Sequence, residues 1–379
     1  MRDILRKKVK KLAGLCFRLH REPLELFSRI LMIYAPQMLY EENERKGQHS
    51  QLTSLLLSNM GRINFPTYPV TTTRQLYLDR QDSIFYYEAQ KLCSALQVLV
   101  EKKEWTEALE LCQQAELKLD VYQSNKLYKM HVLYLPAFLR KLTAPSMLCY
   151  ALSIQVEVLE KLRQYDEAVA LLGRLLNQKN FLQDSRARWY DRLALNLHQH
   201  LKKPHLALEV IREGMRDAEV RGGHRLSLSE RAERILAMLN REKRKKKKSK
   251  TEGEEEEDEE EGMKWDGPSF MCPKTAPLVL ITGRSLPRDI PGMKRVYVMD
   301  GAEEGSKIAC SVEELVIGHY EKNGFPNGIH GEGSTFHAIF GMFFWDIIYS
   351  AVPDAFINKH QILPLDLNSP FFYARFGSL

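Results

Sequence analysis

Residues 80–240 constrain the fold most, because they carry helical periodicity throughout and contain very little proline or glycine. Apolar side chains recur there at the three- and four-residue spacing of an amphipathic helix, and few residues would break one. The pattern predicts packed helices and excludes a sheet in this part of the chain. The whole chain has 379 residues, which is enough for about two or three domains.

A sequence echo within this stretch indicates repeated helix pairs. Trp105-Thr-Glu-Ala-Leu recurs as Tyr165-Asp-Glu-Ala-Val and, more weakly, as Pro204-His-Leu-Ala-Leu. An aromatic residue followed by a small alanine is typical of the points where two helices cross closely in helical-repeat proteins. The unequal intervals favour degenerate, tetratricopeptide-like hairpins over a regular solenoid.

Charged residues are distributed unevenly along the chain. The net charge is +6, yet residues 241–262 hold eight basic and ten acidic residues, so the remainder carries +8. This balance favours an anionic partner, either nucleic acid or a membrane surface. Residues 241–262 lack apolar side chains and therefore predict a disordered linker. The composition of residues 243–248 is that of a nuclear localisation signal, and a solubilising tether explains it equally well.

The sequence on either side of these regions predicts different secondary structure. Residues 1–75 contain apolar runs that predict helices, and the first run is basic, forming either a binding surface or an ordinary solvated face. After the linker, residues 278–282 and 296–299 predict strands. The six cysteines form no CxxC pair and have no zinc-ligand spacing, so we expect free thiols in a reducing compartment.

Two further helices are expected near the end of the chain. Ser311 and Glu314 have the spacing of a capping box, which predicts a helix start. Another helix should begin near Ser334. The apolar run 336–352 is too short for a membrane span and contains charged or polar residues, so it predicts a buried helix.

The loop before Ser334 has catalytic character. Glu332 lies between two glycines, which permit unusual backbone dihedrals and close ligand approach. Carboxylate oxygens suit hard cations, so Glu332 is a candidate metal ligand. The alternative is a helix-capping loop whose acid complements the helix dipole.

A second candidate site combines basic and aromatic residues. Arginine supplies forked donors that fit phosphate oxygens, and histidine can add another donor. Two clusters about thirty residues apart could converge across a helical hairpin, and ordinary surface arginines are the alternative. The candidates are Arg186, Arg188, Trp189, Tyr190, Arg192, Arg221, His224, Arg225, Arg231 and Arg234.

Several motifs together resemble the Fanconi-associated nuclease family, and the resemblance runs through nearly the whole chain. They are Asn327-Gly-Ile-His-Gly-Glu-Gly-Ser-Thr-Phe, Trp345-Asp-Ile-Ile, Pro364-Leu-Asp-Leu, Arg188-Trp-Tyr-Asp-Arg-Leu, Gly223-His-Arg-Leu-Ser-Leu and Asn59-Met-Gly-Arg-Ile-Asn-Phe-Pro. The resemblance implies a mainly α fold with tetratricopeptide-like repeats followed by a partial α/β module of the PD-(D/E)xK nuclease class.

The resemblance also implies a domain order. Residues 1–75 would be the C-terminal part of a SAP-type DNA-binding domain, and residues 76–240 the tetratricopeptide-like domain. Residues 241–268 would be the charged linker, and residues 269–379 the N-terminal part of a virus-type replication-repair nuclease domain. We therefore expect a chain that is incomplete at both ends.

The implied function is a structure-specific DNA repair nuclease of the nucleus. It would act as a 5′ flap endonuclease and 5′–3′ exonuclease in interstrand crosslink repair, with Mg²⁺ or Mn²⁺, and repair proteins could bind its helical domain. Glu332 resembles the family's first metal ligand. Arg188 and His224, and more weakly Arg234 and Lys294, match positions that hold DNA.

One departure from the family pattern is important. A PD-(D/E)xK centre needs a further Asp and a Glu-x-Lys pair to hold the metal and orient water. Pro353-Asp354 does not supply it, because no acid-x-Lys follows. We therefore expect this chain alone to be inactive, and a non-catalytic DNA-binding or scaffold protein with helical repeats is the alternative.

Overall fold

The structure is a computed structural model, and it separates into two compact units. The first, called here the helical unit, comprises Met1–Phe270 and Tyr349–Leu379; the second, the small unit, comprises Met271–Ile348. The described residues are 2–13, 20–36, 51–248, 264–265, 267–268, 278–286, 295–300, 307–331, 333–367 and 369–374. Within them, no helix is both long and apolar enough to cross a bilayer.

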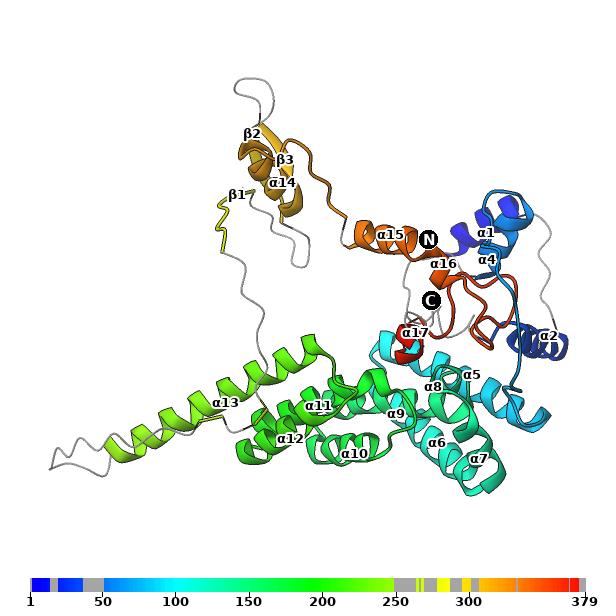
Figure 1. Cartoon of the computed structure of the whole chain (residues 1–379), viewed down its shortest axis with the longest axis horizontal. Coiled ribbons are helices and arrows are strands. Elements are labelled where there is room, and N and C mark those ends of the chain that lie inside the picture. The colour runs from blue at the N-terminus through cyan, green and yellow to red at the C-terminus, as the bar shows by residue number, and fades with distance from the viewer. Residues whose placement is uncertain are drawn as a thin grey trace. The chain divides into compact units, whose positions relative to one another are not determined.

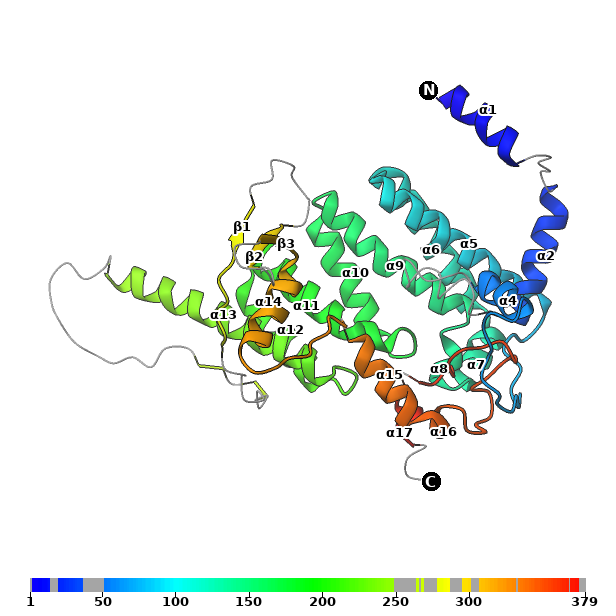
Figure 2. The ribbon, with the colours of Figure 1, turned by 90° about the horizontal axis from the view of Figure 1, so that it is seen from above.

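The helical unit consists of helices that stack one after another from α5 to α13 (Figure 1 and Figure 2). Their apolar faces share one continuous core, except for the short helix α8, whose Phe138 and Leu139 belong to a small separate cluster. The elements are α1 (Arg2–Ala13), α2 (Arg21–Tyr34), α4 (Gln51–Asn59), α5 (Arg80–Lys102), α6 (Trp105–Ser124), α7 (Lys126–Tyr134), α8 (Ala137–Arg140), α9 (Ala144–Lys161), α10 (Tyr165–Asn177), the 3-10 turn η1 (Gln183–Ser185), α11 (Arg186–Leu195), the π-helical turn η2 (Asn196–His200), α12 (Pro204–Arg216), α13 (Gly222–Lys248) and α17 (Pro370–Ala374).

The predicted helix pairs are confirmed. Each copy of the sequence echo begins a helix, at the starts of α6, α10 and α12. The alanine of each copy, Ala108, Ala168 or Ala207, is completely buried. A small residue is needed at this position because a larger side chain would push the crossing helices apart. Residues 51–248 are described without a gap and contain no strand.

The end of α13 differs from the linker boundary expected at residue 241. The helix continues without interruption to Lys248. Basic side chains at a helix C-terminus interact favourably with the helix dipole, which opposes the self-repulsion of this lysine-rich segment. Most of the remaining linker lies outside the described residues.

Residues 349–374 belong to the helical unit, although the sequence grouped residues 269–379 in one module. The Asp354 carboxylate accepts hydrogen bonds from the backbone N–H groups of Thr73 and Arg74, at 2.7 and 3.1 Å, and pairs with the Arg74 guanidinium at 3.1 Å. Tyr68 stacks on Phe356 with ring centroids 3.8 Å apart, and its hydroxyl donates to Gln361 O at 2.6 Å. These contacts join residues far apart in sequence, which local patterns cannot report.

The small unit contains a three-stranded antiparallel sheet in the order β1-β2-β3. Its strands are β1 (Arg284–Ser285), β2 (Tyr297–Asp300) and β3 (Lys307–Cys310), and its helices are α14 (Val312–Lys322), α15 (Ser334–Phe343) and α16 (Trp345–Ile348). The register of the central pair places Tyr297 opposite Cys310 and Asp300 opposite Lys307.

Expectations for the small unit are partly confirmed. The strand predicted over residues 296–299 forms one residue later as β2, and the complete capping box of Ser311 and Glu314 begins α14. The strand predicted over residues 278–282 is absent from this described segment, whose Leu278 and Leu280 are 93% and 82% exposed. No described segment of backbone pairs with it. A high β-propensity favours a strand only where a packed, pleated surface is available.

The buried helix predicted over residues 336–352 is wrong. A helix begins at Ser334 as expected, but α15 ends after Phe343 and none of its side chains is buried. Phe336 and Phe343 are 77% and 81% exposed. An apolar run shows which side chains would gain from burial, and it does not identify the surface that would cover them.

Candidate nucleic-acid interface

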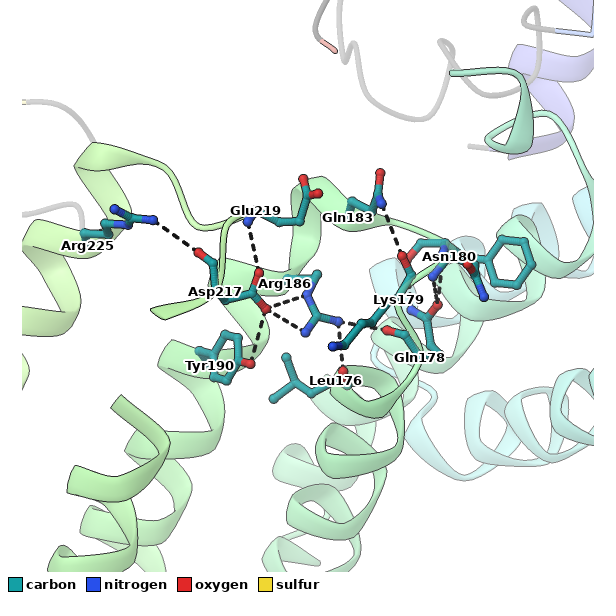
Figure 3. Close-up of polar contacts among 11 residues, drawn as sticks. Leu176, Gln178, Lys179, Asn180, Gln183, Arg186, Tyr190, Asp217, Glu219 and Arg225 are labelled. Carbon is teal, nitrogen blue, oxygen red and sulfur yellow. Dashed lines mark hydrogen bonds and ion pairs between the residues drawn. The ribbon is translucent and has the colours of Figure 1, made fainter. Parts of the chain in front are cut away.

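Arg186, one of the ten candidates, is a structural residue. Its side chain is only 4% exposed and pairs with Asp217 at 2.6 Å, linking the start of α11 to the end of α12 (Figure 3). The same guanidinium donates to the carbonyl oxygens of Leu176 and Gln178, each at 2.8 Å. Burial acts to raise the pKa of Asp217, but the bonds from Arg186 outweigh it and hold this pKa below its usual value.

Several other candidates also have partners within the protein. Trp189 and Tyr190 are buried, and the Trp189 indole N–H donates to Ser153 Oγ at 3.0 Å. The remaining paired cations bind acids or a carbonyl of neighbouring elements: Arg192 with Glu160, Arg221 with Asp184, Arg225 with the Asp217 carbonyl and Arg231 with Asp191.

Arg188 and His224 differ from these residues. Both side chains are exposed. Among the described residues, no hydrogen bond or ion pair engages the Arg188 guanidinium or the His224 imidazole. Their donors are therefore available to an external anion.

The helices that carry Arg188 and His224 run side by side in the same direction. Arg231 Nε donates to Asp191 Oδ1 at 2.7 Å, and His198 Nε2 lies 3.3 Å from Met238 Sδ. Each pair spans 40 residues, so η2 and α11 keep a constant register against α13. In this register, residue 224 is level with residue 184.

This register places the two available donors on neighbouring helices. Arg188 lies one turn before Asp191 on α11, and His224 lies two turns before Arg231 on α13, so both fall on the facing edges of their helices. Their levels along the helix axes differ by about one turn, or about 5–6 Å. The register is compatible with the convergence of Arg188 and His224 that the sequence suggested, which stays a prediction.

The other three predicted site residues have different outcomes. Arg234 is exposed on α13, where its Nε donates to the Glu230 carbonyl at 3.1 Å. Lys294 and Glu332 lie outside the described residues. Next to Glu332, Gly333 has a left-handed φ of +83°, which a side chain would strain, and it caps the start of α15.

A cavity of about 580 Å³ lies beside Arg188, between α9, α10 and α11. Lys161 and His200 also line it, and the His200 ring stacks on Tyr165 with centroids 3.9 Å apart. Sequence reasoning missed both residues. His200 lies in the π-helical turn η2, which changes the direction of its side chain and has no clear sequence signal, although such turns are frequent at functional sites.

A divalent metal does not fit the described residues. Among them, no group of three or more His, Cys, Asp or Glu side chains is arranged to hold a metal ion. Mg²⁺ requires octahedral oxygen ligands, and a single carboxylate cannot fix it. The described part of the chain therefore contains no metal centre from which a reaction step could be derived.

Comparisons with known proteins identify relatives along the chain. Residues 82–236 match the family "Fanconi-associated nuclease 1, TPR domain", where TPR denotes the tetratricopeptide repeat. Fanconi-associated nuclease 1 of Mus musculus is 39% identical over 378 residues, covering 99% of this chain and 35% of that protein. The Homo sapiens protein is 39% identical over 98% of this chain and 35% of its own length.

A plant relative shows the same relationship at a greater distance. The Fanconi-associated nuclease 1 homolog of Arabidopsis thaliana is 30% identical over 85% of this chain and 32% of that protein. The chain spans about a third of the length of the relatives that it matches. It is therefore a homologue of Fanconi-associated nuclease 1 over that third, and its helical repeats correspond to the tetratricopeptide-repeat domain of this family.

Proposed function

We propose that this chain contributes the end-binding part of a nuclear, structure-specific DNA repair nuclease. Its substrate would be branched or 5′-flapped DNA, processed during interstrand crosslink repair. The observation that carries the proposal is the pair of available donors, Arg188 and His224, on the facing edges of α11 and α13. The N–H donors of a guanidinium and an imidazole together suit a terminal phosphate, which offers several oxygen acceptors and more charge than an internal phosphodiester.

Family likeness supports the finer assignments. Residues 1–75 are proposed as part of a SAP-type domain, and residues 269–379 as part of a PD-(D/E)xK module with Glu332 as a ligand of Mg²⁺ or Mn²⁺. Repair proteins are proposed to bind the helical domain. A non-catalytic DNA-binding scaffold is the alternative, favoured by the lack of a metal-holding cluster among the described residues.

The test of end binding compares 5′-phosphorylated and unphosphorylated flap substrates. Arg188→Ala and His224→Ala should each reduce the preference for the phosphorylated end by about tenfold, the effect of losing one charge-assisted hydrogen bond of about 1.5 kcal/mol. Overall duplex affinity should change less. Lys129→Ala is the matched control, because Lys129 is exposed on α7 and its removal also deletes one positive charge.

Equal binding of the two ends by the unsubstituted chain would remove the basis for the proposal. The nuclease and scaffold alternatives are separated by a longer chain that contains a further Asp and a Glu-x-Lys pair. In it, Glu332→Gln should abolish metal-dependent cleavage and leave DNA affinity nearly unchanged. Full cleavage by this variant would exclude Glu332 as a metal ligand, and robust cleavage by the 379-residue chain would place the centre elsewhere.

A further inference from the structure

The second half of α13 is a cationic surface that the end-binding site does not use. Among the described side chains of α13, which end at residue 244, Leu239 is the last buried one, and Arg241, Lys243 and Arg244 are all exposed. Figure 1 shows α13 extending past the helices against which it packs. The sequence from 241 to 248 is REKRKKKK, so this extension has seven basic residues and one acid.

Six of the basic residues of α13 fall on one side of the helix by their spacing. His224, Arg231, Arg234, Arg241, Lys245 and Lys248 follow one another at intervals of three, four or seven residues. Positions with these intervals lie on one face of an α-helix. We call this set the basic stripe, and its first member is the end-binding residue His224.

Charge along the basic stripe increases away from the end-binding site. Arg231 is neutralised by Asp191, and Glu230 lies one turn before Arg234 and offsets part of its charge. Beyond Arg234, the acid on the helix is Glu242, which precedes six of the extension's seven basic residues by one to six positions. The uncompensated positive charge therefore lies in the part of α13 that no apolar packing explains.

The length of the stripe matches a repeat of duplex DNA. His224 and Lys248 are separated by 24 residues of continuous helix. At about 1.5 Å per residue this distance is about 36 Å. One turn of B-DNA is about 34–36 Å long, so phosphates of the same strand return to the same face of the duplex after this distance.

We propose that the basic stripe lies along the phosphate backbone of the duplex next to the DNA end, with Lys248 at phosphates about one helical turn from that end. The inference rests on the proposed function, since Arg188 and His224 set the position of the end. α13 would thus act as a ruler that requires about ten base pairs of duplex behind the bound phosphate. The ligand is duplex nucleic acid recognised through its backbone, without base readout.

The test compares two triple variants that remove the same charge from opposite faces of one helix. The stripe variant carries Arg241→Gln, Lys245→Gln and Lys248→Gln. The control variant carries Lys243→Gln, Lys246→Gln and Lys247→Gln, at positions that lie on the opposite side by helical spacing. Glutamine keeps a similar helix propensity, and circular dichroism checks that the helix content is unchanged.

Binding of the whole chain is measured against salt concentration for duplexes of about 6 and about 16 base pairs, shorter and longer than one turn. For the longer duplex, the stripe variant should lower the slope of log K against log salt by about 2–3, since each lost phosphate contact removes about 0.9. The control variant should lower it by less than about 1, and neither should change binding of the short duplex.

Each other outcome has a definite meaning. Equal effects of the two variants, or an equal loss on both duplexes, would overturn the stripe. If both variants instead weaken binding to a purified nuclear import receptor and leave the DNA slopes unchanged, residues 243–248 serve as a localisation signal and the inference is wrong. Unphosphorylated duplexes are measured in parallel, so a missing 5′-phosphate preference contradicts the proposed function separately from the stripe.

Discussion

Arg186 and Arg188 lie two residues apart on α11 and have opposite surroundings. The Arg186 guanidinium is buried against Asp217 and two backbone carbonyls, whereas Arg188 is exposed without a partner among the described residues. The helical turn separates their directions by about 200°. The same residue type therefore has two different environments here, one that stabilises the fold and one for which we propose binding.

Substitution should separate these functions. Arg186→Ala should lower the free energy of unfolding by about 3 kcal/mol, because it leaves the Asp217 carboxylate and two carbonyls without their donor in a buried site. Arg188→Ala should change it by less than about 0.5 kcal/mol, as is usual for an exposed residue. Urea denaturation followed by circular dichroism measures both. Similar midpoints for the two variants would contradict the structural role of Arg186.

At the scale of elements, sequence signals predicted what depends on near neighbours. The echo at Trp105, Tyr165 and Pro204 marked three helix starts, and Ser311 marked another, because periodicity and capping act within a few residues. The strand predicted over residues 278–282 depended on a distant backbone partner and did not form.

The candidate site follows the same rule. Arg188 and His224 could be named as candidates from residue type and family likeness, but their levels on the two helices needed the register of α11 against α13. The sequence could not remove Arg186 from the binding cluster, because its partner Asp217 lies 31 residues away. Lys161 and His200 were missed for a related reason, since helix stacking brings them to the cavity beside Arg188.

Two glycines test how closely the helices pack. In α12, a Cβ at Gly214 would lie 2.9 Å from Tyr190 Cγ and 3.0 Å from Leu228 Cδ1, whereas a Cβ at Gly173 in α10 would meet nothing within 4 Å. Gly214→Ala should therefore destabilise the domain by about 1–3 kcal/mol through overpacking. Gly173→Ala should stabilise it by about 0.5–1 kcal/mol, since alanine restricts the unfolded chain and favours helix.

Thermal unfolding of both glycine variants provides the measurement. The two substitutions make the same chemical change at internal helix positions, so each serves as the control for the other. A rise in melting temperature for Gly214→Ala would show that α11, α12 and α13 pack more loosely than the structure indicates.

At the scale of the molecule, residues 349–374 are held to the segment 68–74 by polar contacts, in which Asp354 and Gln361 are buried and their partners are partly exposed. Burial acts to raise the pKa of Asp354, but the hydrogen bonds from Thr73 and Arg74 outweigh it and lower this pKa. Burial also raises the pKa of Tyr68 to about 12, so its hydroxyl remains a donor at neutral pH. The contact therefore requires an ionised Asp354 and a protonated Tyr68.

The stability that this contact contributes should depend on pH. Because the pKa of Asp354 is lower in the folded chain than its ordinary value of about 3.9, its contribution is complete above about pH 5 and is lost as the pH falls through the folded pKa. Asp354→Asn should reduce stability by about 1–3 kcal/mol at pH 7. Its unfolding free energy should also fall less between pH 5 and pH 3 than that of the unsubstituted chain, as urea titrations at each pH would measure. Parallel pH curves would contradict this assignment.

The same contact should keep a cut chain together. With a protease recognition sequence inserted after Lys250, cleavage should produce two fragments that still elute as one species in gel filtration. The combination of Asp354→Ala and Tyr68→Phe should allow them to separate, because it removes the ion pair and the hydroxyl bonds that join residues 68–74 to residues 354–361. Separation of the fragments without these substitutions would show that the contact is weak.

The return of residues 349–374 to the helical unit has a mechanical consequence for the small unit. Trp265 packs against the helical core, with Arg212 over its ring at 5.7 Å, and Tyr349 donates to Ile362 O at 2.8 Å on the other side of the insertion. The small unit is thus connected to the helical unit at both of its ends, so it is an insertion and not a domain attached by one linker. A doubly tethered module samples a smaller volume than one on a single flexible connection, so it would lose less entropy on engaging a DNA substrate held by the helices as we propose.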